Sequence, residues 1–265
     1  MIIKLEDRAL LKVSGEDSKT FLQSQFSNDI NQINCKDVQI NAYCQHQGKI
    51  VALLWVFIEN NYFYLSFPED LKQHVLSKLN IFKLMSKVQI EDLSLEFNQY
   101  GLIDEKNQRS LTIKNNLSLL TTREEINTNG VIQQWEKACV DNTLPEIYLS
   151  TSEQFIPQAL NLDINELGVS FTKGCYPGQE VVARMHYLGK PKRRLFQFSS
   201  KYEATTGDLI NVKDSKSLKP SGVILRVAKI DENYHLLGIF EIQHINESAY
   251  LNNDVNKSLV IINAK

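Results

Sequence analysis

One cysteine stands in a setting that favours thiol chemistry. Cys175 lies between Gly174 and the pair Pro177-Gly178, within the segment FTKGCYPGQEVVARMHYLGKPKRRL that covers residues 171–195. Glycine permits backbone conformations that other residues avoid, and proline fixes φ. The pattern therefore predicts a turn that presents one thiol at the tip of a loop. The alternative is a small buried cysteine beside an ordinary tight turn.

Basic residues gather around this cysteine. Lys173 and Arg184 are close to it in sequence, and a nearby cation stabilises a thiolate and raises its reactivity. Residues 173–194 contain six basic residues against the single acid Glu180: Lys173, Arg184, Lys190, Lys192, Arg193 and Arg194. In a chain of net charge −2, this segment predicts a local positive field suited to an anionic ligand. A solvated linker is the alternative for residues 190–194, and His186 is a further candidate, as a base for the thiol.

Composition narrows the class of protein. The chain has 265 residues, 43% of them hydrophobic, and a pI near 6.2, which does not suit general nucleic-acid binding. The N-terminus has no apolar signal region, and the nine-residue apolar run at 50–58 is too short to span a bilayer. The four cysteines are far apart and form no C-x-x-C pair, so we expect free thiols, a cytoplasmic location and no metal site.

Apolar periodicity predicts the elements that position the cysteine. A helix is expected after Ser14 or Asp17 as its cap, with Phe21, Leu22 and Phe26 at helical spacing and a turn at 27–29. Residues 40–95 predict a β-β-α-β unit, with strands at 50–58, 62–65 and 88–90 and a helix whose apolar stripe is Leu71, Val75 and Leu79.

The rest of the chain is dominated by strand patterns. Short strands are expected at 111–113 and 117–121, whereas residues 135–145 are ambiguous. From about Lys192 onward, strand-like segments alternate with polar turns, at 195–198, 222–227, 235–242 and 259–262. This texture predicts a small all-β domain at the C-terminus.

The octapeptide KGCYPGQE at 173–180 resembles the signature K-G-C-Y-x-G-Q-E of the YgfZ family. Further segments fit that family in chain order: VSGED at 13–17, FLQ at 21–23, SNDI at 27–30, GKI at 48–50, residues 83–88, FIPQ at 155–158, VVAR at 181–184 and KRRL at 192–195. The resemblance spans most of the chain and is weakest in 96–135 and after 200. The family falls within the superfamily of the glycine-cleavage T-protein, a tetrahydrofolate-dependent aminomethyltransferase.

The resemblance implies an α+β protein with a T-protein-like folate-binding fold. It divides the chain into a split folate-binding core at 1–40 and 96–190, an inserted β-β-α-β unit at 41–95, and a C-terminal β-barrel at 191–265. The last two agree with the strand and helix patterns described above.

The resemblance also implies roles for the motif. Cys175 is expected to be a reactive thiol with a redox or cluster-related role, with Lys173 beside it in the catalytic set, and Gly174 and Gly178 shape the loop. The expected contacts to tetrahydrofolate or a derivative are Asn28, Asp29, Tyr176, Gln179, Glu180 and Arg184. The implied function is a folate-binding accessory protein for the assembly, repair or maintenance of iron–sulfur enzymes, including one needed for tRNA thiomethylation.

One departure from the T-protein pattern bears on activity. Aminomethyltransferases carry acidic residues shortly after the position of Gly48, whereas residues 49–54 are KIVALL, without an acid to manage the proton. A folate-dependent one-carbon transferase stays open as an alternative if Asp29 or Glu180 supplies the carboxylate, so the chain is not firmly assigned as an enzyme.

The expected partners are folate and iron–sulfur client enzymes or assembly factors. A tRNA-binding module acting through residues 190–194 is a second alternative. The slightly acidic total charge and the absence of aromatic residues interleaved in that run argue against it. We therefore expect neither stable nucleic-acid binding nor membrane association.

Overall fold

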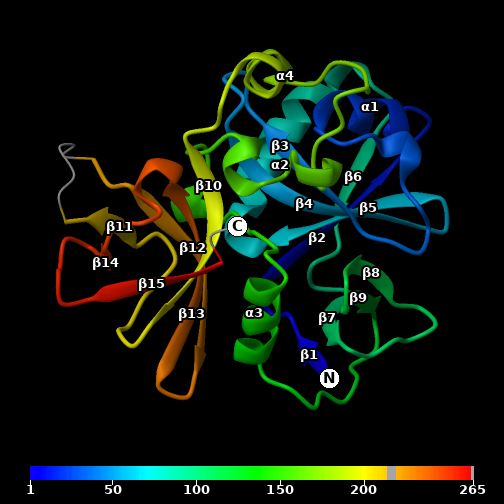
Figure 1. The fold of residues 1–265 in the computed structure, drawn as a ribbon. Helices are drawn as coiled ribbons and strands as arrows, with labels where there is room; N and C mark the ends of the chain where they lie inside the picture. Colours follow the sequence, from blue (N-terminus) through cyan, green and yellow to red (C-terminus); the bar gives the residue numbers. More distant parts are fainter. Residues whose placement is uncertain (214–218, 264–265) are drawn as a thin grey trace.

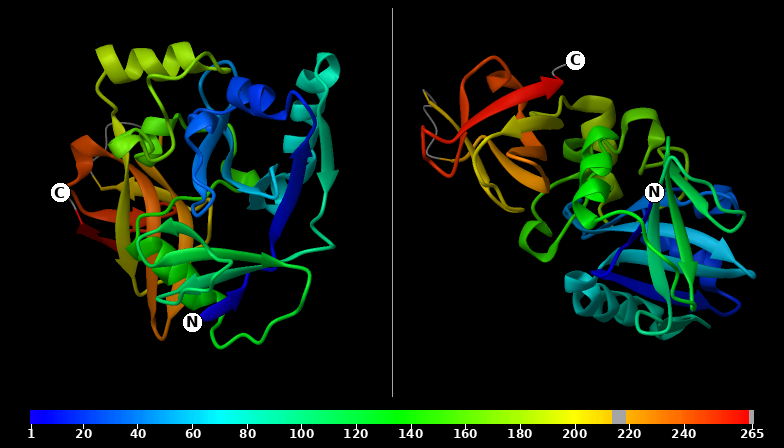
Figure 2. Two further views of the ribbon diagram at one scale, coloured as in Figure 1. Left: turned by 90° about the vertical axis from the view of Figure 1, so that its right-hand side faces the viewer. Right: turned by 90° about the horizontal axis from the view of Figure 1, so that it is seen from below.

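The computed structural model describes residues 1–213 and 219–263, so residues 214–218 and 264–265 of the predicted barrel lie outside the described part. The described chain forms two antiparallel sheets and a closed barrel (Figure 1). Figure 2 shows the barrel at one end of the molecule and the two sheets at the other, with α3 between them.

The first sheet has five strands in the order β3-β4-β5-β2-β6. Their bounds are β2 Arg8–Ser14, β3 Gln39–Cys44, β4 Ile50–Glu59, β5 Tyr62–Pro68 and β6 Gln89–Asp92. Residues 50–57 of β4 are all buried, which accounts for the uninterrupted apolar run in the sequence. Helix α1 (Ser18–Gln25) follows β2, and α2 (Lys72–Phe82) follows β5. The expected stripe of Leu71, Val75 and Leu79 is confirmed, since all three are fully buried.

The predicted β-β-α-β order is therefore present in residues 50–92. However, β2, from the N-terminal segment, lies between β5 and β6 in the same sheet. Strands that are neighbours in space are separated in sequence here, and periodicity alone carries no information about such pairing. The division of the chain into a split core and an insert stays a prediction.

The second sheet has four strands in the order β1-β7-β9-β8. Their bounds are β1 Ile2–Lys4, β7 Asn98–Ile103, β8 Leu111–Lys114 and β9 Leu117–Thr122. Helix α3 (Ile132–Asp141) occupies part of the stretch that was ambiguous in sequence, and it contacts both this sheet and the barrel. Its buried residues are Trp135, Cys139 and Val140.

The C-terminal strands close into the expected barrel, in the order β10-β13-β12-β11-β14-β15. The bounds are β10 Arg193–Ser200, β11 Leu209–Val212, β12 Gly222–Ile230, β13 Asn233–Glu241, β14 Ala249–Leu251 and β15 Ser258–Asn263. A separate apolar cluster that includes Phe198, Ile210 and Phe240 fills its interior. Closure leaves no unpaired sheet edge in this part of the fold.

Between α3 and the barrel, the chain consists of short helical turns and one further helix, α4 (Gln179–Leu188). The 3₁₀ turns within residues 1–213 and 219–263 are Ile30–Gln32, Glu69–Leu71, Lys83–Met85, Leu149–Thr151, Pro157–Leu160, Ile164–Glu166 and Ile242–His244. Among the described residues, no helix is both long and apolar enough to cross a membrane.

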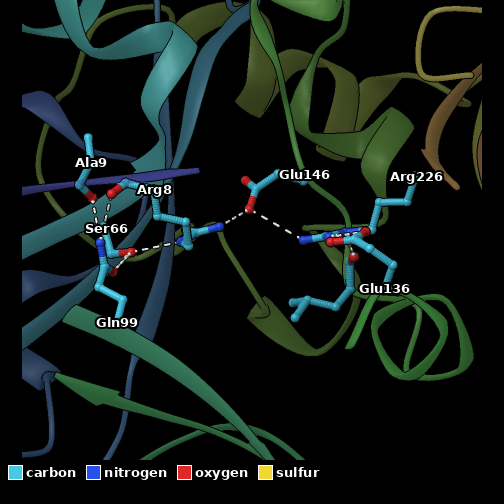
Figure 3. A network of polar contacts seen from close by, with 8 residues as sticks. Arg8, Ala9, Ser66, Gln99, Glu136, Glu146 and Arg226 are labelled. Atoms are coloured by element: carbon cyan, nitrogen blue, oxygen red, sulfur yellow. Dashed lines mark hydrogen bonds and ion pairs between the residues drawn. The ribbon is translucent and has the colours of Figure 1, made fainter. Parts of the chain in front are cut away.

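A buried chain of charges joins the parts of the fold (Figure 3). The Glu146 carboxylate accepts from Arg8 of β2 at 2.6 Å and from Arg226 of the barrel strand β12 at 3.3 Å. Arg226 also donates to Glu136 of α3 at 2.7 Å. Since Arg226 and Glu146 are almost completely buried, each charge depends on its partners for stabilisation.

Candidate functional site

The motif runs from an irregular segment into the first turn of α4. Gly178 is the N-cap of this helix and has a φ of +81°. A helix over 179–188 was not among the elements expected from the sequence. Only Val182 of α4 is buried, so its apolar periodicity is weak.

Lys173 is an internal anchor of the motif. Its ammonium group donates to the carbonyl oxygens of Gln23 at 2.6 Å, of Phe26, and of Asn28 at 3.1 Å. A lysine has three N–H donors, so these bonds occupy all of them. The acceptors lie at the end of α1 and in the turn that follows, where helix carbonyls lack partners. Burial lowers the pKa of Lys173 to about 8.

Two glycines hold the motif against the turn at residues 45–49. A Cβ on Gly178 would lie 2.4 Å from the Gln45 carbonyl oxygen and 2.6 Å from Cα of Gly48. A Cβ on Gly48, which also has a positive φ, would lie 3.0 Å from Cβ of Val181. This backbone contact fixes the C-terminal end of the loop, whereas Lys173 fixes its N-terminal end. Only glycine permits the contact at position 178.

Two further contacts tie the motif to the interior. The buried Gln158 donates its Nε2 to the carbonyl oxygen of Val182 at 2.7 Å. Tyr176 is buried, its pKa is raised by that burial, and its ring centroid lies 5.2 Å from the Lys173 ammonium. Gln158 belongs to the FIPQ segment, but its contact with α4 could not be predicted from the spacing of residues in the chain.

Between these anchors, Cys175 is exposed. Of the other cysteines, Cys44 and Cys139 are buried, and burial raises the pKa of both thiols to about 12. Cys35 is exposed as well, in the loop before β3. Gly174 has open space around its Cβ position, so the side of the loop next to the thiol is free. The arrangement holds a thiol at the surface on a loop with fixed ends.

The turn that carries Asn28 and Asp29 lies next to the motif, because the Asn28 carbonyl accepts from Lys173. The side chains of both residues are occupied within the chain. Asn28 bonds the backbone of Ile40 and of Asp29, and Asp29 accepts from Gln23, Asn31 and Gln32. Partial burial raises the pKa of Asp29, but these hydrogen bonds outweigh it and lower the pKa below the ordinary value.

The remaining predicted folate contacts lie on α4. Gln179 is half-buried, whereas Glu180 and Arg184 are exposed. His186, weighed as a base for Cys175, stacks instead on Phe171 with ring centroids 3.7 Å apart. None of the six predicted folate contacts lines the cavities described next. Within the described residues, no group of three potential metal-ligating side chains gathers.

A cavity of about 560 Å³ lies where the core meets the barrel. Its lining includes Asp141, Thr143, Asn161 and, from the barrel side, Phe196 and Ile242. A second cavity of about 250 Å³ shares Thr143 and Asn161 with it and adds Lys114. Sequence reasoning missed these residues, since they come from distant segments and form no local motif.

Lys114 is a cation in poorly hydrated surroundings. Burial lowers its pKa, and it forms no ion pair within residues 1–213 and 219–263. A carboxylate ligand would supply the missing counter-charge. Asp141 is paired with Lys137 at 2.6 Å and is partly exposed. The two cavities together therefore offer an acid and a base beside apolar walls.

Comparison with known proteins gives a consistent set of relatives. The chain is 32% identical over 264 residues to an uncharacterized protein of Haemophilus influenzae, covering 96% of this chain and 90% of the relative. It is 28% identical to the tRNA-modifying protein YgfZ of Buchnera aphidicola, covering 86% and 83%, and 27% identical to that of Colwellia psychrerythraea, covering 87% and 82%. No protein-family model matches the chain.

The fold has a counterpart among solved structures. The glycine cleavage system aminomethyltransferase T of Bartonella henselae superposes with a TM-score of 0.69, covering 98% of this chain and 84% of that one. At 10% identity, this likeness shows a shared fold. Taken with the motif at 173–180, the relatives show that the chain belongs to the YgfZ family, built on the fold of the glycine-cleavage T-protein.

Proposed function

We propose that the chain is an accessory protein of iron–sulfur enzymes, one of them needed for tRNA thiomethylation, that binds a reduced folate and acts on a partner protein through Cys175. The exposed thiol on a loop with fixed ends is the observation that carries this proposal. Relatives named tRNA-modifying proteins support the link to tRNA, and the aminomethyltransferase-like fold supports folate.

Cys175 has two routes open to it at the surface. As a thiolate it attacks a disulfide sulfur of the partner, which forms a mixed disulfide and releases the partner's other sulfur as a thiolate. As a ligand it bonds the iron of a cluster while the cluster is held by the partner. Both routes need an accessible sulfur, which Cys44 and Cys139 do not offer.

The folate fits the two adjoining cavities better than the motif helix. A reduced folate has a polar pterin, an aromatic spacer and a glutamate tail. The Asp141 carboxylate is suited to accept from the pterin amino group, and Lys114, which has no ion pair among the described residues, is suited to a tail carboxylate. Phe196, Ile242 and Ile164 supply apolar surface for the rings.

Calorimetry with tetrahydrofolate tests this half of the proposal. We expect micromolar binding by the unmodified chain and at least tenfold weaker binding by Asp141→Asn and Lys114→Met, a loss of about 1.4 kcal/mol. Asp231→Asn and Lys106→Met make the same changes at exposed positions and should bind normally. Binding that is lost in Arg184→Ala but kept in the two cavity variants would move the site to α4. No binding to the unmodified chain would remove folate from the proposal.

The acids considered as catalysts of aminomethyl transfer are poorly placed for that reaction. Residues 50–54 are fully buried and carry no acid. Asp29, one of the two substitutes considered, has its carboxylate occupied by Gln23, Asn31 and Gln32. The other, Glu180, is exposed on α4. We therefore propose an accessory role in preference to a transferase.

A further inference from the structure

The outer surface of α4 is unusually open. The helix lies along the top edge of the molecule in Figure 1 and in the left view of Figure 2. Five residues on or beside it are exposed and the half-buried Phe171 stacks on one of them, His186; we refer to these six as the α4 face: Phe171, Arg184, His186, Tyr187, Lys190 and Lys192. None of them has a role in the proposed folate site or in holding Cys175.

The α4 face carries three cations without counter-charges. Of the six basic residues in 173–194, Lys173 is buried against carbonyl oxygens, Arg193 pairs with Glu241 and Arg194 pairs with Asp163. Arg184, Lys190 and Lys192 form no ion pair within the described part of the chain. Glu180 is the one acid in this segment, so the exposed charge on this side is positive.

Aromatic rings lie among these cations. Phe171 and His186 are stacked, and Tyr187 meets both rings edge-on, at 4.8 Å from His186 and 6.2 Å from Phe171. Tyr187 is 65% exposed. Arg184 lies one helical turn before Tyr187 on the same side of α4, which places a cation beside the rings. This grouping of rings and cations was not evident from the sequence, because the rings lie outside the basic run at residues 190–194.

We propose that the α4 face binds a single-stranded RNA segment, with unstacked bases on the rings and phosphates on Arg184, Lys190 and Lys192. Proteins commonly bind single-stranded nucleic acid with aromatic side chains that stack on the bases and with cations that contact the phosphates. The buried centre of a protein–protein interface is more apolar than the surrounding surface. Within residues 171–192, all of which the structure describes, Leu188 is the one aliphatic side chain that is more than half exposed.

Because the α4 face offers three cations, we expect it to bind RNA weakly and transiently. A Kd of about 10–100 µM near physiological salt is expected for contacts of this number. Such an affinity agrees with the expectation that the chain forms no stable nucleic-acid complex. RNA binding here is independent of folate and of the thiol, so Cys175→Ser should leave it unchanged.

Fluorescence anisotropy with a labelled, unpaired RNA of about ten nucleotides tests the proposal. Plotted against salt between about 50 and 200 mM, log affinity should fall with a slope of about −2, as expected for three phosphate contacts. Lys190→Glu with Lys192→Glu should weaken binding at least tenfold and flatten the slope. His186→Ala with Tyr187→Ala should weaken it about tenfold and keep the slope.

Matched controls keep the result interpretable. Lys106→Glu with Arg109→Glu reverses two exposed, unpaired cations elsewhere, and Tyr202→Ala removes an exposed ring elsewhere; both should bind like the unmodified chain. Thermal unfolding verifies that each variant is folded. The proposal is overturned if the unmodified chain gives no anisotropy change, if paired RNA of equal length binds as well, or if the α4-face variants bind normally. It is likewise overturned if those variants lose function in cells while RNA binding is absent, which would indicate a protein partner.

Discussion

Lys173 illustrates how a motif residue works through the backbone. The sequence suggested that its charge stabilises the thiolate of Cys175, but its three donors are taken by carbonyl oxygens of the α1 end. Replacing it with methionine keeps the apolar stem and leaves those oxygens without a partner. We expect Lys173→Met to lower the free energy of unfolding by about 3 kcal/mol, measured by urea denaturation.

The same lysine gives a pH dependence with a definite sign. Its pKa is about 8 in the folded chain and 10.5 when unperturbed. Between these values the unfolded chain binds a proton that the folded chain has released, so stability rises with pH in this window. The advantage of the unmodified chain over Lys173→Met should therefore grow between about pH 8 and 10. An advantage that shrinks would mean that the protonated form is the one required.

The four cysteines should separate into two classes on alkylation. Cys175 and Cys35 are exposed, whereas Cys44 and Cys139 are buried with thiol pKa values raised to about 12. With iodoacetamide on the folded protein, we expect the buried pair to react at least about 100-fold more slowly. Peptide mapping by mass spectrometry gives the rates. Comparable labelling of Cys44 and Cys175 would contradict the described burial.

At the residue scale, the sequence located the thiol but not its supports. The turn residues around Cys175 are local, so their pattern was sufficient to predict a loop. Gln158 acts on Val182 from 24 positions away, and the fold places Lys114 and Asp141 in the linings of two adjoining cavities. Such contacts leave no periodic or spacing signal in a single sequence.

At the scale of elements, the junction of α4 with the turn at 45–49 is the tightest backbone contact of the motif. Gly178 combines a positive φ with a Cβ position 2.4 Å from the Gln45 oxygen. We expect Gly178→Ala to cost about 3 kcal/mol of unfolding free energy, from strain and overlap together. Gly174→Ala is a matched control in the same loop, four residues before Gly178, where the Cβ position is open, and should change stability by less than about 0.5 kcal/mol. Equal effects at both glycines would refute this difference.

Elements with strong periodicity were predicted well. The buried strand β4 and the stripe of α2 followed from apolar patterns, and four of the six barrel strands (β10, β12, β13 and β15) followed from alternation with turns. The short strands β11 and β14 were missed. Helix α4 was missed because it buries only Val182, and β2 was not recognised as a neighbour of β5 and β6 because strand pairing is non-local.

At the scale of the whole molecule, the buried charges of Figure 3 connect the first sheet, α3 and the barrel. Glu146 is fully buried between Arg8 and Arg226. Glu146→Gln should therefore lower the free energy of unfolding by about 3–5 kcal/mol, because it removes the counter-charge of Arg8 and leaves the buried Arg226 with Glu136 alone. The exposed pair of Glu16 and Lys87 provides the control, since Glu16→Gln should cost less than about 1 kcal/mol. A small effect at Glu146 would show that the parts of the fold are held together by apolar contacts alone.

The central claim is that the chain acts through the thiol of Cys175. The most direct measurement is the level of thiomethylated nucleosides in tRNA from bacteria that lack their own family member and carry this chain. We expect the unmodified protein and Cys35→Ser to restore the modification, whereas Cys175→Ser, present in equal amount, should not restore it. Full restoration by Cys175→Ser would contradict it.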